Sequence, residues 1–533
     1  MKKTLFNFVL ALLITTIFIN CANRGTPGGG PKDELPPVII KSTPENYSTN
    51  FEGNEIEIIF DEYIKIKDIQ KQLIISPPME YQPDITPLSA ASKKVVIKIK
   101  DTLAPNTTYA FNFGNSITDN NEGNPYPYYR YVFSTGSYID SLKVTGNIID
   151  AVKKSPETFV NVGLYEIDST FSDSIIFKEK PKYITNTLDS VTTFAIENVK
   201  PGKYLLVALK DGNGDNKYQQ KSDQIAFHNS FINVPTDSTY TLKLFNEEAT
   251  FDATRPKLIS GEKIAFGYEG DYKGMKIKMV SETPEDFNYR ITKDPKTDSL
   301  MYWYTPRMKV DSLLFKVQKD DFEKDFTVRI SEQKRDSIRV DILTGNTIGL
   351  KEPLKLTSNT PITKFDASKI TLIDKDSSAV SFDTKFDTIT NTYDFNFEKT
   401  EDNLYKMQIL PEAFVDIFDY KNDTLNVSVK TKKSSDYGYV RFTLANATFP
   451  IIIQLTDKDG KLKYESYVTE QQPVDFLDIN PAIYAIRIIH DANGNQKYDT
   501  GSYLEKRQPE KISHFQNVEI RADWGVEETL EFK

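Results

Sequence analysis

Several residue types that support common protein chemistries are scarce in this sequence. Its 533 residues include one cysteine, three histidines and seven methionines. A single cysteine excludes a disulfide within the chain, a Cys-rich zinc site and a redox pair. The formal net charge is −10, so the chain lacks the basic footprint of nucleic-acid binding, and no nucleic-acid partner is expected.

Motifs of known catalytic families are also missing. The sequence has no H-E-x-x-H, no G-x-S-x-G and no P-loop. Asp and Glu number 76, so carboxylate pairs are too frequent for any one of them to mark an active site. His490 precedes an acidic loop, but a lone histidine at a strand end is more often structural. We therefore expect no enzymatic activity.

A targeting segment is present at the N-terminus. Residues 1–20 have the basic start and the apolar run, Leu5 to Ile19, of a signal peptide. The run is shorter than the roughly 20 residues of a transmembrane helix. It ends at Asn20-Cys21, which resembles a bacterial lipobox, although Ala, Gly or Ser is usual in place of Asn20. The resemblance implies cleavage before Cys21 and lipidation of its sulfur.

Residues 21–35 are expected to form a flexible tether, because they are rich in Gly, Pro and small polar residues. Ala22 stands where many inner-membrane lipoproteins have Asp. By resemblance to lipoproteins of Bacteroidetes-like bacteria that lack this Asp, the expected location is the outer membrane. The bilayer is then a partner through the acyl anchor. Which face of that membrane the protein occupies stays open.

The remainder predicts an all-β protein. Thr, Val and Ile alternate with charged residues almost throughout, which is typical of half-buried strands. A chain of this length is too long to fold around one hydrophobic core, so about four or five domains are expected. The fold class is therefore all-β, with β-sandwich domains in tandem after the signal peptide and tether.

The first of these domains, residues 36–137, carries family markers. They include S-T-P-E-N from Ser42, I-I-F-D-E-Y from Ile58, L-A-P-N-T-T-Y from Leu103 and a closing F-S-T-G. These motifs resemble a bacterial Ig-like domain of the SbsA type. The resemblance implies a β-sandwich that serves as a spacer, and it implies no chemistry.

An internal repeat defines two further domains. The segments from Pro201 and from Pro481 align without a gap, and each leads a predicted strand into a D-x-N-G-[DN]-x-K-Y loop. This pattern resembles transthyretin-like (prealbumin-like) β-sandwich modules of bacterial envelope proteins. The resemblance assigns residues 138–245 and 434–533 to such modules.

Two regions have weaker signals. Residues 341–433 are interpreted as a diverged Ig-like β-sandwich, in which Tyr405 to Ile409 match Tyr109 to Phe113. A short helix is expected within residues 410–420. Residues 246–340 are rich in predicted strands but resemble no family that we can name, and they are left as an unassigned β domain.

The two repeat loops are candidate calcium sites, because side chains at alternating positions can converge on one cation. Both lack the bidentate Glu of an EF-hand, and Asp223 or Glu505 replaces it only if the chain folds back. The alternative is a tight turn, in which Asx side chains cap their own backbone. Calcium is the one cofactor considered. Its candidate ligands are Asp211, Asn213, Asp215 and Lys217 in the first loop, and Asp491, Asn493, Asn495, Lys497 and Asp499 in the second.

Aromatic clusters suggest a second kind of site. Trp303, Tyr128 and Tyr129 lie in aromatic runs whose rings could stack on sugars. The alternative is that these rings pack in the core or pair across strands. The expected function is a non-catalytic, lipid-anchored envelope scaffold or binding protein with an unidentified protein or glycan partner. The alternative function is a glycan-binding accessory lipoprotein of a polysaccharide-uptake system.

Overall fold

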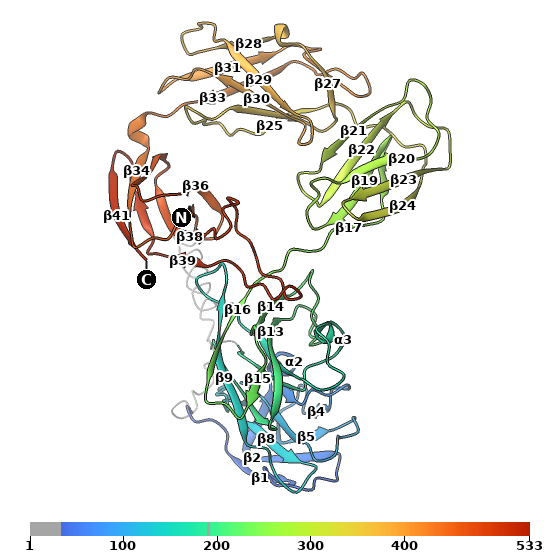
Figure 1. Cartoon of the computed structure of the whole chain (residues 1–533), viewed down its shortest axis with the longest axis vertical. Coiled ribbons are helices and arrows are strands. Elements are labelled where there is room, and N and C mark those ends of the chain that lie inside the picture. Colours follow the sequence, from blue (N-terminus) through green and yellow to red (C-terminus); the bar gives the residue numbers. More distant parts are fainter. Residues whose placement is uncertain (1–32, 189–191, 533) are drawn as a thin grey trace, which may run out of the picture.

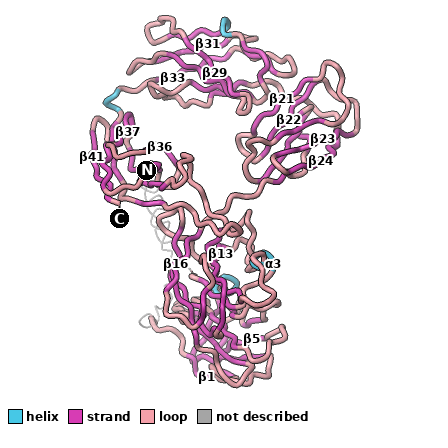
Figure 2. The backbone as a smooth tube through the Cα atoms, viewed as in Figure 1, coloured by secondary structure: helices cyan, strands magenta, loops and turns pink. Residues whose placement is uncertain are grey.

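A computed structural model describes residues 33–188 and 192–532. The predicted signal peptide, Cys21 and most of the predicted tether lie outside the described residues. Strands and loops make up almost the whole chain (Figure 2), which confirms the all-β fold class. The short helical segments are α2 (Ile69–Gln72), α3 (Ile175–Lys178), η1 (Ala367–Lys369) and η2 (Ser434–Asp436). No helix of the described residues is long and apolar enough to cross a membrane.

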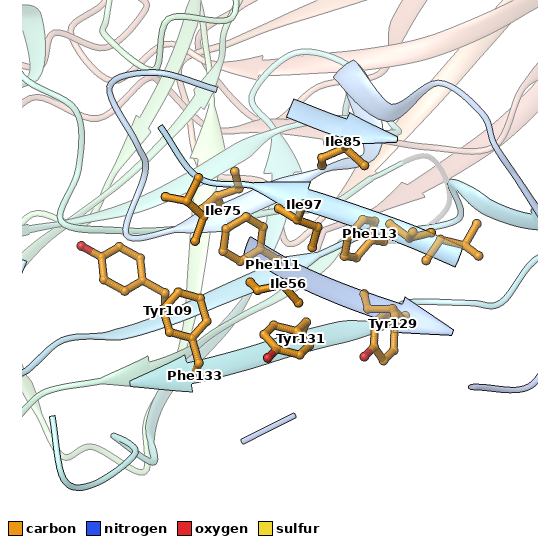
Figure 3. Close-up of a cluster of buried hydrophobic side chains, with 14 of the residues drawn as sticks. Ile56, Ile75, Ile85, Ile97, Tyr109, Phe111, Phe113, Tyr129, Tyr131 and Phe133 are labelled. Atoms are coloured by element: carbon orange, nitrogen blue, oxygen red, sulfur yellow. The ribbon is translucent and has the colours of Figure 1, made fainter. Parts of the chain in front are cut away.

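We number the β domains 1 to 5 in chain order. Domain 1 is a sandwich of two antiparallel sheets. One sheet has the order β1-β2-β5-β4, with β7 beside β2, and the other has the order β3-β6-β8. Aromatic and Ile side chains from both sheets fill the space between them, as Figure 3 shows for Ile56 and Ile97 of the first sheet and Phe111 and Phe133 of the second. The strands are β1 (Ile39–Thr43), β2 (Glu55–Ile66), β3 (Ile74–Ser76), β4 (Asp84–Thr86), β5 (Ser92–Lys98), β6 (Thr108–Asn112), β7 (Ile117–Asp119) and β8 (Arg130–Ser134).

Domain 2 also has two sheets, ordered β11-β10-β13-β14 (with β15 beside β13) and β12-β9-β16. Its first and last strands, β9 and β16, pair in parallel. The sheet built on β13 is apolar on both faces, because Tyr204 and Leu206 point into the sandwich while Leu205 and Val207 belong to a second core outside it. The strands are β9 (Leu142–Asp150), β10 (Asn161–Glu166), β11 (Tyr183–Asn186), β12 (Thr193–Val199), β13 (Gly202–Lys210), β14 (Gln224–Phe227), β15 (Ile232–Val234) and β16 (Thr239–Leu244).

Domain 5 repeats the topology of domain 2 strand for strand. Its sheets are β36-β35-β38-β39 (with β40 beside β38) and β37-β34-β41, and β34 pairs with β41 in parallel. Tyr204 and Tyr484 occupy the same place, and each hydroxyl donates to the carbonyl four residues earlier, at 3.0 and 2.8 Å. The strands are β34 (Gly438–Ala445), β35 (Ile451–Thr456), β36 (Leu462–Val468), β37 (Val474–Ile479), β38 (Ala482–His490), β39 (Ile512–His514), β40 (Val518–Ile520) and β41 (Gly525–Glu531).

Domain 3 occupies the range left unassigned from the sequence. Its two antiparallel sheets enclose a core rich in Tyr and Phe. They are ordered β17-β19-β22-β21, with β18 beside β19, and β20-β23-β24. The strands are β17 (Asp252–Ala253), β18 (Lys257–Ser260), β19 (Lys263–Glu269), β20 (Lys276–Met279), β21 (Asn288–Lys293), β22 (Ser299–Thr305), β23 (Ser312–Lys319) and β24 (Phe322–Arg329).

Domain 4 has the strand order of domain 1. The amide of Ala104 donates to the Tyr109 hydroxyl at 2.9 Å, and that of Thr400 donates to the Tyr405 hydroxyl at 2.7 Å. The short helix expected within residues 410–420 is wrong, because this segment holds a strand that pairs with β27. The strands are β25 (Val340–Ile342), β26 (Leu354–Ser358), β27 (Ile362–Phe365), β28 (Ile370–Ile373), β29 (Phe382–Asp387), β30 (Thr392–Phe397), β31 (Leu404–Ile409), β32 (Phe414–Asp416) and β33 (Leu425–Lys430).

The domains are arranged as a closed ring with one extension. Domains 2, 3, 4 and 5 follow one another around the ring, and domain 1 extends from domain 2 (Figure 1). The ring closes because a loop of domain 5 reaches back to domain 2. The junction of domains 1 and 2 is also bonded, since Arg130 Nη2 donates to Asn198 Oδ1 at 2.8 Å.

Candidate functional site

The first repeat loop follows β13 and folds around the carboxylate of Asp211. This carboxylate accepts hydrogen bonds from the backbone amides of Gly214 and Asn216, both at 2.7 Å. Gly214 and Asn216 have positive φ, which suits Gly and Asn. The side chains of Asn213, Asp215 and Gln219 also bond to one another, at 2.9 to 3.2 Å.

The second repeat loop follows β38 with the same geometry. Asp491 is fully buried and accepts from the amides of Asn495 and Gln496, at 3.1 and 2.9 Å. Gly494 and Gln496 have positive φ, like their counterparts in the first loop. Asn493 and Asn495 both donate to Asp499 Oδ2, the latter at 2.6 Å. These hydrogen bonds lower the pKa of Asp499, although burial acts in the opposite direction.

A second carboxylate closes each loop. In domain 2, Asp223 accepts from the amides of Gly212 and Gln219, at 3.0 and 2.8 Å. In domain 5, Glu510 accepts from the equivalent amides of Ala492 and Asp499, at 2.8 and 3.0 Å. The chain therefore folds back at Asp223, whereas Glu505 does not return to its loop and pairs with Arg507 at the surface.

These contacts describe a loop whose acidic groups are already engaged by backbone amides. No group of three or more His, Cys, Asp or Glu within the described residues is arranged to hold a metal ion. Lys217 and Lys497 would contribute only backbone carbonyls. Calcium binding therefore stays a prediction beside the tight-turn alternative. Calorimetry separates them, because the turn alternative gives neither heat nor a melting shift at millimolar calcium.

Trp303 lies in a buried contact between domains 3 and 4. It is 3% exposed and packs with Met301, Ile417 and Phe418. Its indole Nε1 donates to Thr292 Oγ1 at 2.9 Å, and Lys263 Nζ lies 4.6 Å from the ring centroid. No face of this ring is left for a sugar, so the structure does not support Trp303 as a stacking platform.

The neighbouring residues Tyr128 and Tyr129 have different environments. Tyr129 is buried between Phe113 and Tyr126, with ring centroids 6.0 and 5.6 Å away. Burial raises the pKa of its hydroxyl. Tyr128 is 43% exposed and lines a cleft of about 200 Å3 between domains 1 and 2. Of the three predicted ligand-binding aromatics, only Tyr128 is accessible.

A contact between domain 5 and domain 2 was not foreseen from the sequence. It is made by the strap, which we define as residues 499–510 of domain 5. Tyr503 at its tip is fully buried against the outer face of domain 2, and its ring lies 5.4 Å from Phe227 and 6.3 Å from Phe177. We define that outer face as the apolar surface formed by Tyr165, Ile176, Leu205, Val207, Leu209, Tyr218, Ile225, Phe227 and Phe245.

Polar contacts surround the buried Tyr503 ring. Its backbone amide donates to Glu247, whose other oxygen accepts from the Tyr218 hydroxyl at 2.7 Å. Lys506 forms an ion pair with Asp173 at 2.7 Å, and its Nζ lies 4.0 Å from the Tyr503 ring centroid. Glu247, Tyr218 and Asp173 all come from domain 2 or the linker that follows it.

A signal for the strap was present in the repeat. Eleven positions separate Asp499 from Glu510, whereas four separate Gln219 from Asp223, so the second loop is seven residues longer. A loop that carries Tyr at its centre and Gly two positions earlier is a candidate for docking.

Comparisons with known proteins agree with the fold. Residues 33–135 match the bacterial Ig-like domain family. A search of curated proteins finds no match. Among solved structures, domains 1–6 of the surface layer protein SbsC share 11% identity with a TM-score of 0.14, over 90% of this chain and 67% of that one.

Two further solved structures consist of Ig domains. Tandem Ig repeats of Dlar share 14% identity with a TM-score of 0.13, over 34% of this chain and 96% of theirs. An I-band fragment of titin shares 11% identity with a TM-score of 0.12, over 45% of this chain and 93% of its own. At such identities and TM-scores these likenesses carry no functional argument. What is established is an all-β chain of tandem sandwiches whose residues 33–135 are similar to bacterial Ig-like domains.

Proposed function

We propose that this chain is a non-catalytic scaffold or binding protein of the bacterial envelope, anchored by a lipid at Cys21. The observation that carries the proposal is the bonded framework of the domains. Five sandwiches are joined by side-chain contacts at their junctions, and the ring formed by four of them closes on itself. A framework of this kind holds its loops at fixed separations.

The junction of domains 3 and 4 illustrates the support for rigidity. Glu262 is 1% exposed and pairs with both Arg307 and Arg335. The Arg335 guanidinium also lies 4.8 Å from the centroid of the Phe418 ring in domain 4. A buried carboxylate with two guanidinium partners fixes the chain where it enters domain 4, because separating it from both partners would leave an uncompensated buried charge.

A glycan-binding accessory role has less support. It required accessible aromatic platforms, and Trp303 and Tyr129 are buried. Tyr128 alone remains for that role. Loss of glycan-array binding in Tyr128→Ala, with Tyr138→Ala as an exposed aromatic control, would revive it.

The anchoring part of the proposal has a direct test. Cells that express the full chain are grown with an alkyne-tagged fatty acid, and the protein is isolated from the envelope. We expect label on the wild-type protein and none on Cys21→Ala. Equal labelling of both proteins, or no labelling of either, contradicts the lipid anchor.

The scaffold part is tested separately, by cross-linking in intact envelopes followed by identification of linked peptides. We expect links to neighbouring envelope proteins from loops at the sandwich ends. Links confined to the chain itself contradict a scaffold or binding role.

A further inference from the structure

The outer face of domain 2 has the features of a docking surface. Its sheet already buries one apolar face inside the sandwich, so the second apolar face has to be covered by something else. The segment around α3 covers part of this second sheet face, because Ile176 packs on Leu205 and its neighbours in β13. The strap covers the rest with Tyr503, from a domain that lies about 250 residues further along the chain.

The strap is shaped before it docks. The backbones of Ser502 and Arg507 bond to each other in both directions, at 2.8 and 2.9 Å. At its base, the Glu510 amide donates to the Asp499 carbonyl at 3.0 Å. These bonds lie within the strap itself, so the loop keeps its form without domain 2 and loses little conformational freedom on docking.

The fit between strap and face is specific. Gly501 passes so close to Phe245 that an added Cβ would lie 2.5 Å from the ring. Gln508 Nε2 donates to the carbonyl of Phe227 at 3.0 Å and to Asn229 Oδ1 at 2.7 Å. The surface therefore selects an aromatic ring, a small residue two positions before it, and a basic residue three positions after it.

The contact leaves two buried hydroxyls without partners. Tyr503 and Tyr165 both bury hydroxyls that have no hydrogen-bond partner among the described residues. Buried polar atoms without partners weaken an interface. The Tyr503 ring thus stabilises the contact, while the two hydroxyls reduce its net stability.

We propose that the outer face of domain 2 is a docking surface for a segment with a central aromatic residue flanked by glycine and a basic residue, and that the strap is its internal ligand. With the strap docked, domains 2 to 5 form a closed ring and the surface is occupied. With the strap released, the ring opens and the same surface accepts a segment of matching chemistry. This proposal goes beyond the scaffold role and does not depend on the lipid anchor.

Ring opening is tested by small-angle X-ray scattering on the chain that begins after Cys21. We expect Tyr503→Ala to increase the radius of gyration, because loss of the buried ring lowers the ratio of closed to open molecules about a hundredfold. Leu504→Ala, at an exposed neighbour on the same strap, should scatter like the wild type. Wild-type scattering from Tyr503→Ala would refute the latch.

Docking is tested with a labelled peptide of residues 499–510, closed by a covalent link between its ends. Tyr503→Ala should empty the surface in the protein, and Leu504→Ala, at an exposed neighbour, serves as its control. Circular dichroism confirms that both variants fold.

We expect the peptide to bind Tyr503→Ala about tenfold or more tightly than the wild type or Leu504→Ala, since their surface is already occupied. A peptide with alanine in place of its tyrosine should not bind. Equal binding to all three proteins, or binding to none, would overturn the docking surface.

Discussion

Domains 2 and 5 share one topology but expose different surfaces. Their eight strands correspond in order, and both place the first strand beside the last in parallel. On the outer side of the central sheet, Leu205 and Val207 of domain 2 correspond to Ala485 and Arg487 of domain 5. One copy therefore has an apolar outer face, and the other has a mixed one, in which Arg487 and Gln454 lie beside Ile489.

The loops that follow β13 and β38 also differ, and the longer one lies in the domain that lacks the apolar outer face. Domain 2 has the short loop closed by Asp223, and domain 5 has the longer one closed by Glu510, which carries the strap. The two copies have thus diverged into a surface and its ligand. The comparison teaches that a repeat preserves its core and turns, while changes on one face and in one loop create a new contact within the chain.

The largest expected effect comes from exchanging a residue between the two outer faces. Val207→Arg gives domain 2 the residue of domain 5 and buries an unpaired charge, so the free energy of unfolding should fall by about 3–5 kcal/mol and the strap should be released. Denaturant unfolding and scattering measure both effects.

The reverse exchange, Arg487→Val, serves as the control. Arg487 Nε donates to Gln454 Oε1 at 2.7 Å, so its loss leaves one acceptor and should cost about 1–2 kcal/mol. Equal losses for the two exchanges would show that the outer faces do not differ in the way described.

The next largest effect concerns the closing carboxylates. Asp223→Ala and Glu510→Ala each remove the acceptor of two backbone amides, and each should cost about 1–3 kcal/mol in thermal unfolding. Glu510→Ala alone should also speed proteolysis of the strap, because it opens the base. Glu505→Ala is the matched control, since its carboxylate bonds only at the surface. Faster strap cleavage in Asp223→Ala would contradict this assignment.

A smaller loss of stability, equal in domains 2 and 5, is expected when the equivalent tyrosines Tyr204 and Tyr484 lose their hydroxyls. Tyr204→Phe and Tyr484→Phe each remove one hydrogen bond to a backbone carbonyl and should each cost about 0.5–1.5 kcal/mol. Domain-resolved hydrogen exchange measures both losses in the full chain. A loss in only one domain would mean that the conserved hydroxyl has different roles in the two copies.

The smallest expected effect is a pH dependence of the stability of the fold. Burial, Arg487 and Lys154 lower the pKa of His514, although the Val152 backbone and Asp150 act in the opposite direction. A lowered pKa means that folding favours neutral His514. The contribution of His514 to stability is therefore fully present above about pH 6.5 and weakens as the pH falls below it.

Thermal unfolding of the full chain at pH 7.5 and pH 5.5 tests this direction. The melting temperature of the wild type should be lower at pH 5.5, and His514→Gln should reduce the difference. His490 also has a pKa lowered by burial and by Lys511, so a smaller dependence should remain in the variant. A higher melting temperature at pH 5.5 would reverse the sign and refute the prediction.

Local features of this protein were readable from its sequence. Alternation of apolar and charged residues predicted strands, and the aligned Pro, Tyr and Asp of the repeat predicted two equivalent turns, whose geometry agrees down to the positive φ of Gly214 and Gly494. These features depend on neighbours in the sequence, and the residues themselves therefore specify them.

Contacts between domains were not readable in the same way. The aromatic run around Trp303 suggested a sugar-binding platform. Whether Trp303 is exposed depends, however, on Ile417 and Phe418 of the next domain, which cover it. The same segment was expected to be helical, and strand pairing with β27 overrides that preference. Tyr503 is a single aromatic residue in a polar loop, and only its distant partners reveal its role.

The parallel pairing of the terminal strands in domain 2 has a mechanical consequence. Domain 1 joins the start of β9, and domain 3 follows the end of β16, so tension between these neighbours drags the two strands in opposite directions along their length. The rungs from Thr239–Thr145 to Leu244–Asp150 then bear the load together in shear, and none can peel away first.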